Sequence, residues 1–480
     1  MSRRPKVKVD STLNHKTAVS LFCSGGIGDL AAHSLGIDVL VANELLSDRV
    51  ELHRRNFPDA IAIQGDIWEK AEEIISTTRS ALAGRDLDLM FATPPCQGMS
   101  SNGQGKLLNG IRKGEKPKFD SRNQLIVPTM LVAKALQPAT IVFENVPEME
   151  NTLIEDPNGG TIRILDFIKR ELGLAYNGVW GVVEFADYGV PQRRQRLITI
   201  FSRAHSIKSF IETHGRLLPP TTHSPGGANG KKPWVTVRDV IAGFPPLDAK
   251  DKTSATSTIP YHTVPILDEK KYFWVSNTPP ECGAFDNQCA SCGCQENPTH
   301  GTARNERGIN RARNDTPIRC KECGELLPRP WVEEDGDYRL MSGFTSAYKR
   351  MSWDKPASTL TRNLSYACSD HKLHPDQHRV LSLYEAFHLH TISDFNYSWL
   401  REDGRPVSDK TVRDVIGESI PPRGLRVIYQ FILDILDASG KAEAGAGPEA
   451  SDVSDQRRDR AGMERQDFRR RRSFRSKYAD

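Results

Sequence analysis

Long hydrophobic runs are missing from this 480-residue chain, and their absence excludes several classes of protein. No run of about 18 apolar residues occurs, so we expect no transmembrane helix. The basic N-terminus, MSRRPKVKVD, is not followed by the apolar core of a signal peptide, so we expect no secretion.

A strong excess of charge is also missing. The net charge is +4, and residues 451–480, with ten Lys and Arg and six Asp and Glu, account for all of it. Overall charge therefore does not identify a nucleic-acid-binding protein, and only local clusters could do so. After about residue 438 the composition turns to Ala, Gly, Glu, Asp and Arg, which predicts a disordered tail. Its FRRRRSFRSK segment either attracts phosphates or only keeps the chain soluble.

Cysteines are few, and their number, nine, is odd. In a chain without a secretion signal, paired C-x-x-C motifs favour metal ligands over disulfides. Cys289 and Cys292 form one pair and Cys320 and Cys323 the other, each followed by Gly. Four thiolates at this spacing predict a closed, tetrahedral structural zinc site. Cys282, Cys294 and His300 are nearby alternative ligands.

Short apolar runs alternate with segments of helical length over residues 17–201. The runs are AVSLFC (18–23), IDVLVA (37–42), AIAI (60–63), LDLMF (87–91) and TIVFE (140–144). This alternation predicts an α/β fold with a mostly parallel sheet. VVEF (182–185) and RLITIF (196–201) predict a late antiparallel hairpin at one edge. Residues 205–350 lose the pattern, whereas 378–390 and 422–436 are typical of helices.

A glycine-rich turn follows the first predicted strand. Gly26-x-Gly28-x-x-Ala31 fits a nucleotide-binding turn, and Glu44 ends the next strand, where a carboxylate can hold ribose hydroxyls. By itself the turn is equally consistent with a dinucleotide dehydrogenase or with no ligand.

Three further motifs fall at strand ends. Thr93-Pro94-Pro95-Cys96 holds a thiol on a stiff loop after the run LDLMF, which is not a core position. Glu144 ends the run TIVFE, so its carboxylate would face the same cleft as Cys96. In Gln192-Arg-Arg-Gln-Arg196, alternate residues point to one side, so Arg194 and Arg196 can face the cleft together. Each motif also has a purely structural explanation: Cys96 could be a buried thiol, Glu144 a helix cap, and the arginine segment a solvated run of charges.

Taken together, these motifs resemble the ordered series of the DNA cytosine-5 methyltransferase family. The resemblance covers about 17–205 and 355–437. It adds Phe22 in the cofactor turn, Gly65-Asp66-Ile67 as the adenine-binding turn, and His374-Pro375 to Glu385 as the late helix that supports the recognition domain. Gly417-Glu418-Ser419-Ile420-Pro421-Pro422 is similar to the final cofactor motif. Two departures stand out: the first turn reads Ser-Gly-Gly-Ile-Gly, and Glu418 stands where Asn is usual.

The resemblance implies a Rossmann-like, S-adenosylmethionine-dependent methyltransferase fold with a mixed seven-stranded sheet and a smaller loop-rich target-recognition domain. It implies that Cys96 attacks C6 of a flipped-out cytosine, that Glu144 binds its N3 and amine, and that Arg196 contacts its carbonyl. Arg194 would bond a phosphate or orient the thiol. The implied cofactor residues are Phe22, Gly26, Gly28, Glu44, Asp66, Ile67, Pro94, Glu418 and Ser419.

The expected organisation is a basic extension (1–16), a catalytic and cofactor-binding domain (17–205), a target-recognition domain with the zinc site (206–355), late catalytic motifs (356–437) and the tail (438–480). The partner is double-stranded DNA. We expect a monomeric protein of the bacterial cytoplasm, without membrane contact, alongside a separately acting restriction endonuclease.

Two other functions remain open from the sequence. A transfer-RNA cytosine-5 methyltransferase shares the catalytic motifs, but the Cys-Phe-Thr tripeptide of that branch is absent and the cysteine-rich insertion favours DNA. A non-catalytic DNA-binding module is disfavoured by the intact Cys96, Glu144 and arginines.

Overall fold

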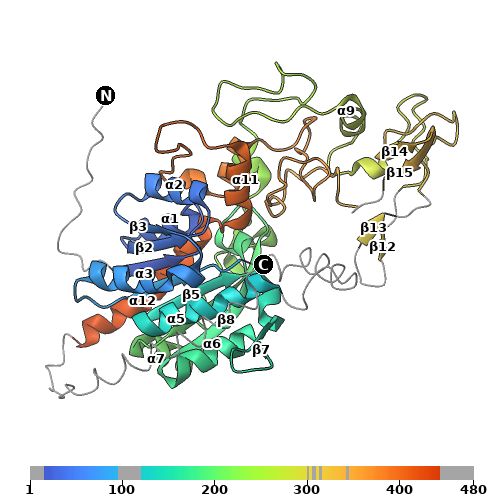
Figure 1. The fold of residues 1–480 in the computed structure, drawn as a ribbon. Coiled ribbons are helices and arrows are strands. Elements are labelled where there is room, and N and C mark those ends of the chain that lie inside the picture. Colours follow the sequence, from blue (N-terminus) through green and yellow to red (C-terminus); the bar gives the residue numbers. More distant parts are fainter. Residues whose placement is uncertain are drawn as a thin grey trace. The chain divides into compact units, whose positions relative to one another are not determined.

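The computed structural model describes residues 16–95, 120–299, 302–304, 310–312, 316–341 and 345–443. The chain forms two compact units (Figure 1). Unit 1 comprises Met1–Val182, Leu197–Leu218 and Ile428–Asp480, and unit 2 comprises Val183–Arg196 and Pro219–Val427. Residues 356–427, expected as a return to the catalytic domain, thus group by their contacts with the loop-rich region. No helix in the described ranges is both long and apolar enough to cross a membrane.

A seven-stranded sheet with the order β3-β2-β1-β4-β5-β9-β8 forms the centre of unit 1. The strands from β3 to β5 pair in parallel, and β9 pairs antiparallel with β5. The predicted α/β class and the late antiparallel strand are therefore confirmed. The strands are β1 (Thr17–Leu21), β2 (Asp38–Glu44), β3 (Ile61–Gln64), β4 (Leu89–Ala92), β5 (Thr140–Asn145), β8 (Asn177–Glu184) and β9 (Gln195–Ser202).

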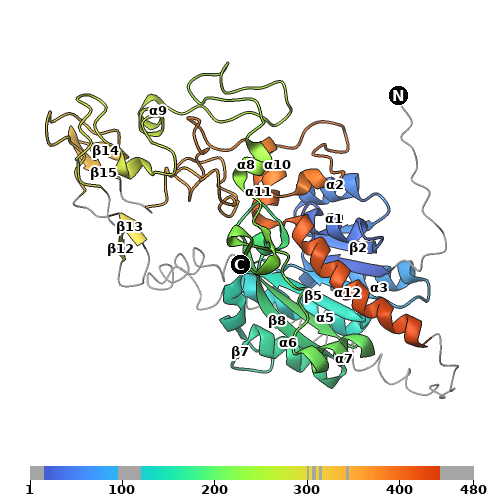
Figure 2. The same ribbon diagram turned by 180° about the vertical axis from the view of Figure 1, so that it is seen from behind.

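Helices cover both faces of this sheet. Helices α3, α5 and α6 pack side by side on one face and bury the main apolar core against β1, β4 and β5 (Figure 1). The C-terminal part of α12 crosses the other face (Figure 2). Tyr429 of this helix stacks on Phe91 of β4 with ring centroids 4.4 Å apart. The helices of this unit are α1 (Ile27–His33), α2 (Ser47–Asn56), α3 (Ile67–Leu82), α5 (Ile126–Leu136), α6 (Ile164–Leu172), α7 (His205–His214) and α12 (Pro422–Glu443), with β6 (Leu153–Glu155) and β7 (Thr161–Arg163) forming a small hairpin.

Unit 2 is rich in loops, as the loss of periodicity predicts. Its helices are α8 (Val237–Ile241), α9 (Glu269–Ser276), α10 (Leu383–Leu389) and α11 (Asp409–Glu418). Its small ribbons are β10–β11 (His223–Ser224 and Lys232–Pro233), β12–β13 (Thr302–Arg304 and Asn310–Ala312) and β14–β15 (Trp331–Glu334 and Asp337–Leu340). Short 3-10 turns complete the described chain: Ser121–Leu125, Pro147–Asn151, Gly173–Ala175, Phe185–Tyr188, Pro225–Gly230, Ala284–Asp286 and Ile392–Asp394.

The helix predicted over 378–390 is shorter than expected, because Ser382 caps it. The Ser382 hydroxyl accepts from the amide of Glu385, and the Glu385 carboxylate accepts from the amide of Ser382. This reciprocal capping box fixes the start of α10 at Leu383. The Glu385 carboxylate also accepts hydrogen bonds from the two terminal guanidinium nitrogens of Arg379, at 2.7 and 2.8 Å. Both side chains of this ion pair are fully buried.

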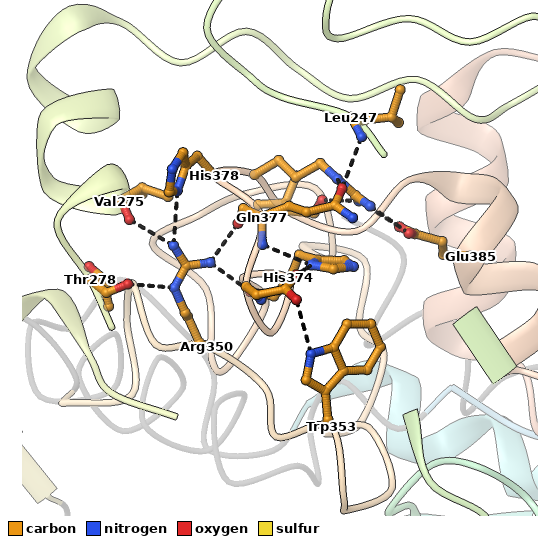
Figure 3. A network of polar contacts seen from close by, with 12 residues as sticks. Leu247, Val275, Thr278, Arg350, Trp353, His374, Gln377, His378 and Glu385 are labelled. Atoms are coloured by element: carbon orange, nitrogen blue, oxygen red, sulfur yellow. Dashed lines mark hydrogen bonds and ion pairs between the residues drawn. The ribbon is translucent and has the colours of Figure 1, made fainter. Parts of the chain in front are cut away.

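A buried arginine joins the segments of unit 2 (Figure 3). Arg350 donates to the carbonyl oxygens of Thr278, Val275 and His374 at 2.7 to 2.9 Å, and burial lowers its pKa to about 10. Nδ1 of His374 accepts the amide of Gln377 at 3.1 Å, and burial lowers the pKa of His374 to about 2. A planar guanidinium has five N–H donors, so it can donate hydrogen bonds to several backbone carbonyls at once. Loops need such donors because they lack the regular backbone hydrogen bonds of a sheet or helix.

Candidate active site

The glycine turn after β1 has the conformation that its sequence requires. Phe22, Ser24 and Gly26 all have positive φ, at 59°, 50° and 83°. A Cβ on Gly26 would lie 2.4 Å from Cε2 of Phe57 and 2.9 Å from Cδ2 of His53, so only glycine fits this close approach. Gly28 lies within the first turn of α1. Ser24 thus adopts a left-handed conformation, which is uncommon for residues other than glycine.

Glu44, the predicted ribose acid, holds this turn in place. It lies at the end of β2 and is 7% exposed. Its Oε2 accepts from the amide of Ser24 at 2.9 Å, and its Oε1 accepts from the amide of Leu46 at 3.0 Å. Each carboxylate oxygen has a further lone pair, so Glu44 can order the turn and still accept from a ligand.

Asp66 and Ile67 begin α3. The Asp66 carboxylate caps this helix by accepting from the amide of Trp68 at 2.9 Å, and Ile67 is buried beneath it. Asn43, which no sequence motif indicated, donates its side-chain amide to the carbonyls of Ile63 and Gly65 at 3.0 and 3.1 Å. The turn before Asp66 is therefore fixed to the end of β2, beside Glu44.

The start of the predicted nucleophile loop is hydrogen-bonded to the segment that carries the predicted acid, Glu144. The side-chain amide of Asn145 donates to the carbonyl of Pro94 at 3.0 Å, and its Oδ1 accepts from the amide of Val146 at 2.8 Å. Thr93 donates its hydroxyl to the carbonyl of Phe22 at 3.0 Å. The carboxyl ends of β1, β4 and β5 thus meet at one edge, with the predicted acid Glu144 7% exposed at the end of β5. Cys96 lies outside the described residues.

A buried polar cluster that no sequence motif indicates lies next to the predicted cofactor-binding turn. Asp29 accepts from the hydroxyl of Ser20 at 2.7 Å and bonds Nε2 of His53 at 2.9 Å. The Cys23 Sγ, a carboxylate oxygen of Asp29 and a ring nitrogen of His53 all lie within 4.8 Å of one another. Burial, together with the nearby charges of Asp29 and Glu44, raises the pKa of Cys23 well above its usual value. The thiol therefore stays protonated. No local spacing relates Ser20, Asp29 and His53, which come from a strand and two different helices.

The arginine motif separates into buried and exposed side chains. Gln192 and Arg194 are 0% exposed, and the Arg194 guanidinium donates to the carbonyls of Leu360 and Gly417. Arg193 is largely exposed and pairs with Glu184 at 2.7 Å. Arg196 is partly exposed and donates to the carbonyl of Gln195. All these contacts lie within unit 2.

The two predicted residues of the final motif have polar partners in the same unit. Glu418 lies 3.4 Å from Arg362, which also donates to Asp414 at 2.9 Å. Ser419 bonds Nε2 of His390 at 3.0 Å. The unusual Glu418 is thus accompanied by a cation that a neutral asparagine would not need.

The structure brings the four predicted zinc ligands together. The Sγ atoms of Cys289 and Cys323 are 3.6 Å apart, as are those of Cys292 and Cys320. Zinc–sulfur bonds of about 2.3 Å in a tetrahedron require sulfur atoms about 3.8 Å apart, so this cluster fits zinc. Backbone amides of Cys292 and Cys323 lower the pKa values of Cys289 and Cys320, the latter to about 6.

A second buried arginine supports this cluster from outside. Arg329 donates to the carbonyls of Asn287, Pro298 and Pro317 at 2.7 to 2.9 Å. It therefore joins the segments that carry the two cysteine pairs. Nothing in the sequence pattern indicated this role, since its partners are all backbone oxygens.

Comparison with known proteins identifies the family. The model of the C-5 cytosine-specific DNA methylase family matches residues 17–434. Type II methyltransferase M1.HgaI of Avibacterium volantium is 27% identical in an alignment of 413 positions that covers 84% of this chain and 94% of the relative. M.AgeI of Thalassovita gelatinovora is 25% identical over 461 residues, covering 84% and 96%. A prophage-encoded DNA modification methyltransferase of E. coli has a TM-score of 0.48 at 20% identity, covering 88% of this chain and 99% of that one. Because the family match spans most of its length, the chain belongs to the C-5 cytosine-specific DNA methylase family and is an S-adenosylmethionine-dependent DNA cytosine-5 methyltransferase.

Proposed function

We propose that this enzyme methylates C5 of cytosine within one specific sequence of duplex DNA, as the modification member of a restriction–modification system. The family match and the Type II methyltransferases among its relatives support this function. A restriction endonuclease would act separately on the same sequence, and the methyltransferase would work as a monomer on the bacterial nucleoid.

Cys96 is the proposed nucleophile. Its thiolate adds to C6 of a cytosine flipped out of the helix, and the electron density released makes C5 nucleophilic. S-adenosylmethionine would supply an electrophilic methyl group, which C5 would accept as S-adenosylhomocysteine leaves. Loss of the C5 proton and elimination of Cys96 then restore the aromatic base and the free enzyme.

Glu144 and Arg196 complete the proposed catalytic set. The Glu144 carboxyl would bond N3 and the exocyclic amine and so stabilise the covalent adduct. Arg196 would donate to the base carbonyl. The hydrogen bond from Asn145 to Pro94 supports the assignment of Glu144, because it joins the acid motif to the residues that lead into Cys96.

The cofactor residues are assigned by the same resemblance. Phe22 would stack on adenine, Glu44 would accept from the ribose, and Asp66 would accept from the adenine amine. The spare lone pairs on the Glu44 carboxylate support this assignment. Ile67, Pro94, Glu418 and Ser419 complete the proposed set.

A decisive test compares substrates directly. Purified enzyme with radiolabelled S-adenosylmethionine should label duplex DNA and not transfer RNA, and Cys96→Ala should abolish labelling while retaining cofactor binding. Bisulfite sequencing of DNA from expressing cells should reveal one methylated sequence. Labelling of transfer RNA alone would instead identify the RNA-modifying branch. Absence of any labelling would leave only a DNA-binding role.

We also propose that Cys289, Cys292, Cys320 and Cys323 hold one structural zinc ion. The sulfur separations fit a four-thiolate site, and all four positions would be filled by protein, so the metal would take no part in methyl transfer. Elemental analysis should find about one zinc per chain. Chelation should weaken specific DNA binding and leave cofactor affinity unchanged. Full activity of Cys289→Ser and Cys320→Ser, with no metal in the wild type, would refute the assignment.

A further inference from the structure

The arginine motif contributes to a buried hydrogen-bonded cluster that the proposed chemistry does not use. Gln192, Arg194 and His390 are each 0% exposed and lie together in unit 2. Three separate segments of the unit meet at these side chains: residues 360–362, residues 389–390 and residues 416–419.

Arg194 bridges two of these segments through their backbone. One terminal nitrogen donates to the carbonyl of Leu360 at 3.0 Å, and the other donates to the carbonyl of Gly417 at 3.0 Å. The planar guanidinium fixes the two donors in one rigid fork, a geometry that the single ammonium of lysine cannot reproduce. Buried carbonyls left without donors would carry a desolvation cost, so this contact determines where the segments lie.

Gln192 and His390 extend the bridge to the third segment. The Gln192 side chain accepts from the amide of Leu360 at 3.0 Å and bonds Nδ1 of His390 at 3.1 Å. Nε2 of His390 lies 3.0 Å from the Ser419 hydroxyl, which itself donates to the carbonyl of Ile416. His390 is therefore neutral with its proton on Nε2, and burial, together with Arg194 and Arg196, holds its pKa well below the usual value.

The segments that this cluster joins pack backbone against backbone. A Cβ on Gly417 would lie 2.3 Å from the amide nitrogen of Arg362 and 2.7 Å from the carbonyl carbon of Thr361. Such an approach leaves no space for a side chain between the two segments. The carbonyls of Leu360 and Gly417 must therefore accept from donors that lie beside the contact. Arg194 supplies these donors.

We propose that Arg194 is a positioning residue that, together with Gln192 and His390, holds segment 416–419 in its active conformation. It does not bond a DNA phosphate. This inference rests on the proposed function, which assigns Glu418 and Ser419 of that segment to the cofactor. It divides the motif into a structural half, Gln192 and Arg194, and a substrate-contacting residue, Arg196.

The test compares Arg194→Lys with Arg193→Gln, a change in the exposed arginine next to it. We expect Arg194→Lys to raise the KM for S-adenosylmethionine by about tenfold, because the cofactor segment loses its bridge. The salt dependence of DNA binding should stay that of the wild type. Arg193→Gln should leave the cofactor KM unchanged.

A phosphate contact would give the opposite pattern. Arg194→Lys keeps a charge, so Arg194→Gln is measured as well: loss of one phosphate contact would reduce the slope of log affinity against log salt by about 1. That reduction, with an unchanged cofactor KM, would overturn the inference. Gln192→Met removes no charge and should raise the cofactor KM as Arg194→Lys does. If the arginine variants do not fold, Gln192→Met alone tests whether this cluster positions segment 416–419. An unchanged cofactor KM in that variant would then refute the positioning role. Direct calorimetry of cofactor binding gives the same comparison even if no DNA substrate is methylated.

Discussion

Asn145→Asp should impair catalysis more than it impairs the fold. The substitution keeps the size of the side chain and the oxygen that accepts from the amide of Val146. It replaces the donor to the carbonyl of Pro94 with a second carboxylate oxygen, at a distance that is now 3.0 Å. Two oxygens cannot share that contact, so the residues leading into Cys96 must move.

The magnitude follows from the burial of the contact. Asn145 is 2% exposed, and a buried hydrogen bond lost with its partner left unpaired costs roughly 1–3 kcal/mol. A displacement of about 1 Å in a nucleophile can reduce the rate by about 100-fold. We therefore expect kcat for methyl transfer to fall by about 100-fold, while the dissociation constant for S-adenosylmethionine changes by less than about twofold.

The assay measures single-turnover methyl transfer and trapping of the enzyme on duplex DNA that contains 5-fluorocytosine. Both should slow in parallel, because the defect lies in the approach of Cys96 to the base. Asn151→Asp makes the same chemical change at an exposed position at the end of the turn Pro147–Asn151 and serves as the control. If Asn145→Asp traps 5-fluorocytosine at the wild-type rate, the bond to Pro94 does not position the nucleophile.

Three further outcomes are expected. Gly26→Ala should weaken cofactor binding and lower the melting temperature, because its Cβ would meet Phe57 at 2.4 Å on a backbone with positive φ; unchanged calorimetry would contradict the geometry of the turn. Arg379→Met should destabilise unit 2 by about 3–5 kcal/mol, because it leaves the carboxylate of Glu385 buried and unpaired; denaturant melts measure this, and Arg379→Met with Glu385→Leu should recover part of the loss. Stability should also fall on acidification. The folded pKa of His374 is about 2, so below its unfolded value of about 6.5 only the unfolded chain takes up this proton, and each pH unit removes up to about 1.4 kcal/mol until about pH 2. His374→Gln should flatten that slope between pH 6 and 4, and an unaltered slope would show that other groups control it.

The sequence alone determined the order of the strands along the chain and which polar side chains stand at their ends. Alternating apolar runs require a sheet with crossover connections, and in such a sheet the carboxyl ends of neighbouring parallel strands meet at one edge. The turn at Gly26, Glu44 and Glu144 could therefore be assigned to that edge from their positions after the apolar runs. The clustering of Cys289, Cys292, Cys320 and Cys323 was equally predictable, because two C-x-x-C-G motifs each fix the local geometry of their own pair.

Only the tertiary structure decided which polar side chains hold these motifs in place. Asn145 bonds Pro94, Asp29 bonds His53, and Arg350 bonds carbonyls of two separate segments, all between residues that no periodicity relates. Alternation along the arginine motif predicted that Arg194 and Arg196 share a side, but it could not tell a buried carbonyl partner from a cleft. The partners of Arg194 lie on segments far along the chain, at Leu360 and Gly417. Local sequence sets which face a side chain can use, whereas the partner on that face depends on long-range packing, which only the folded chain defines.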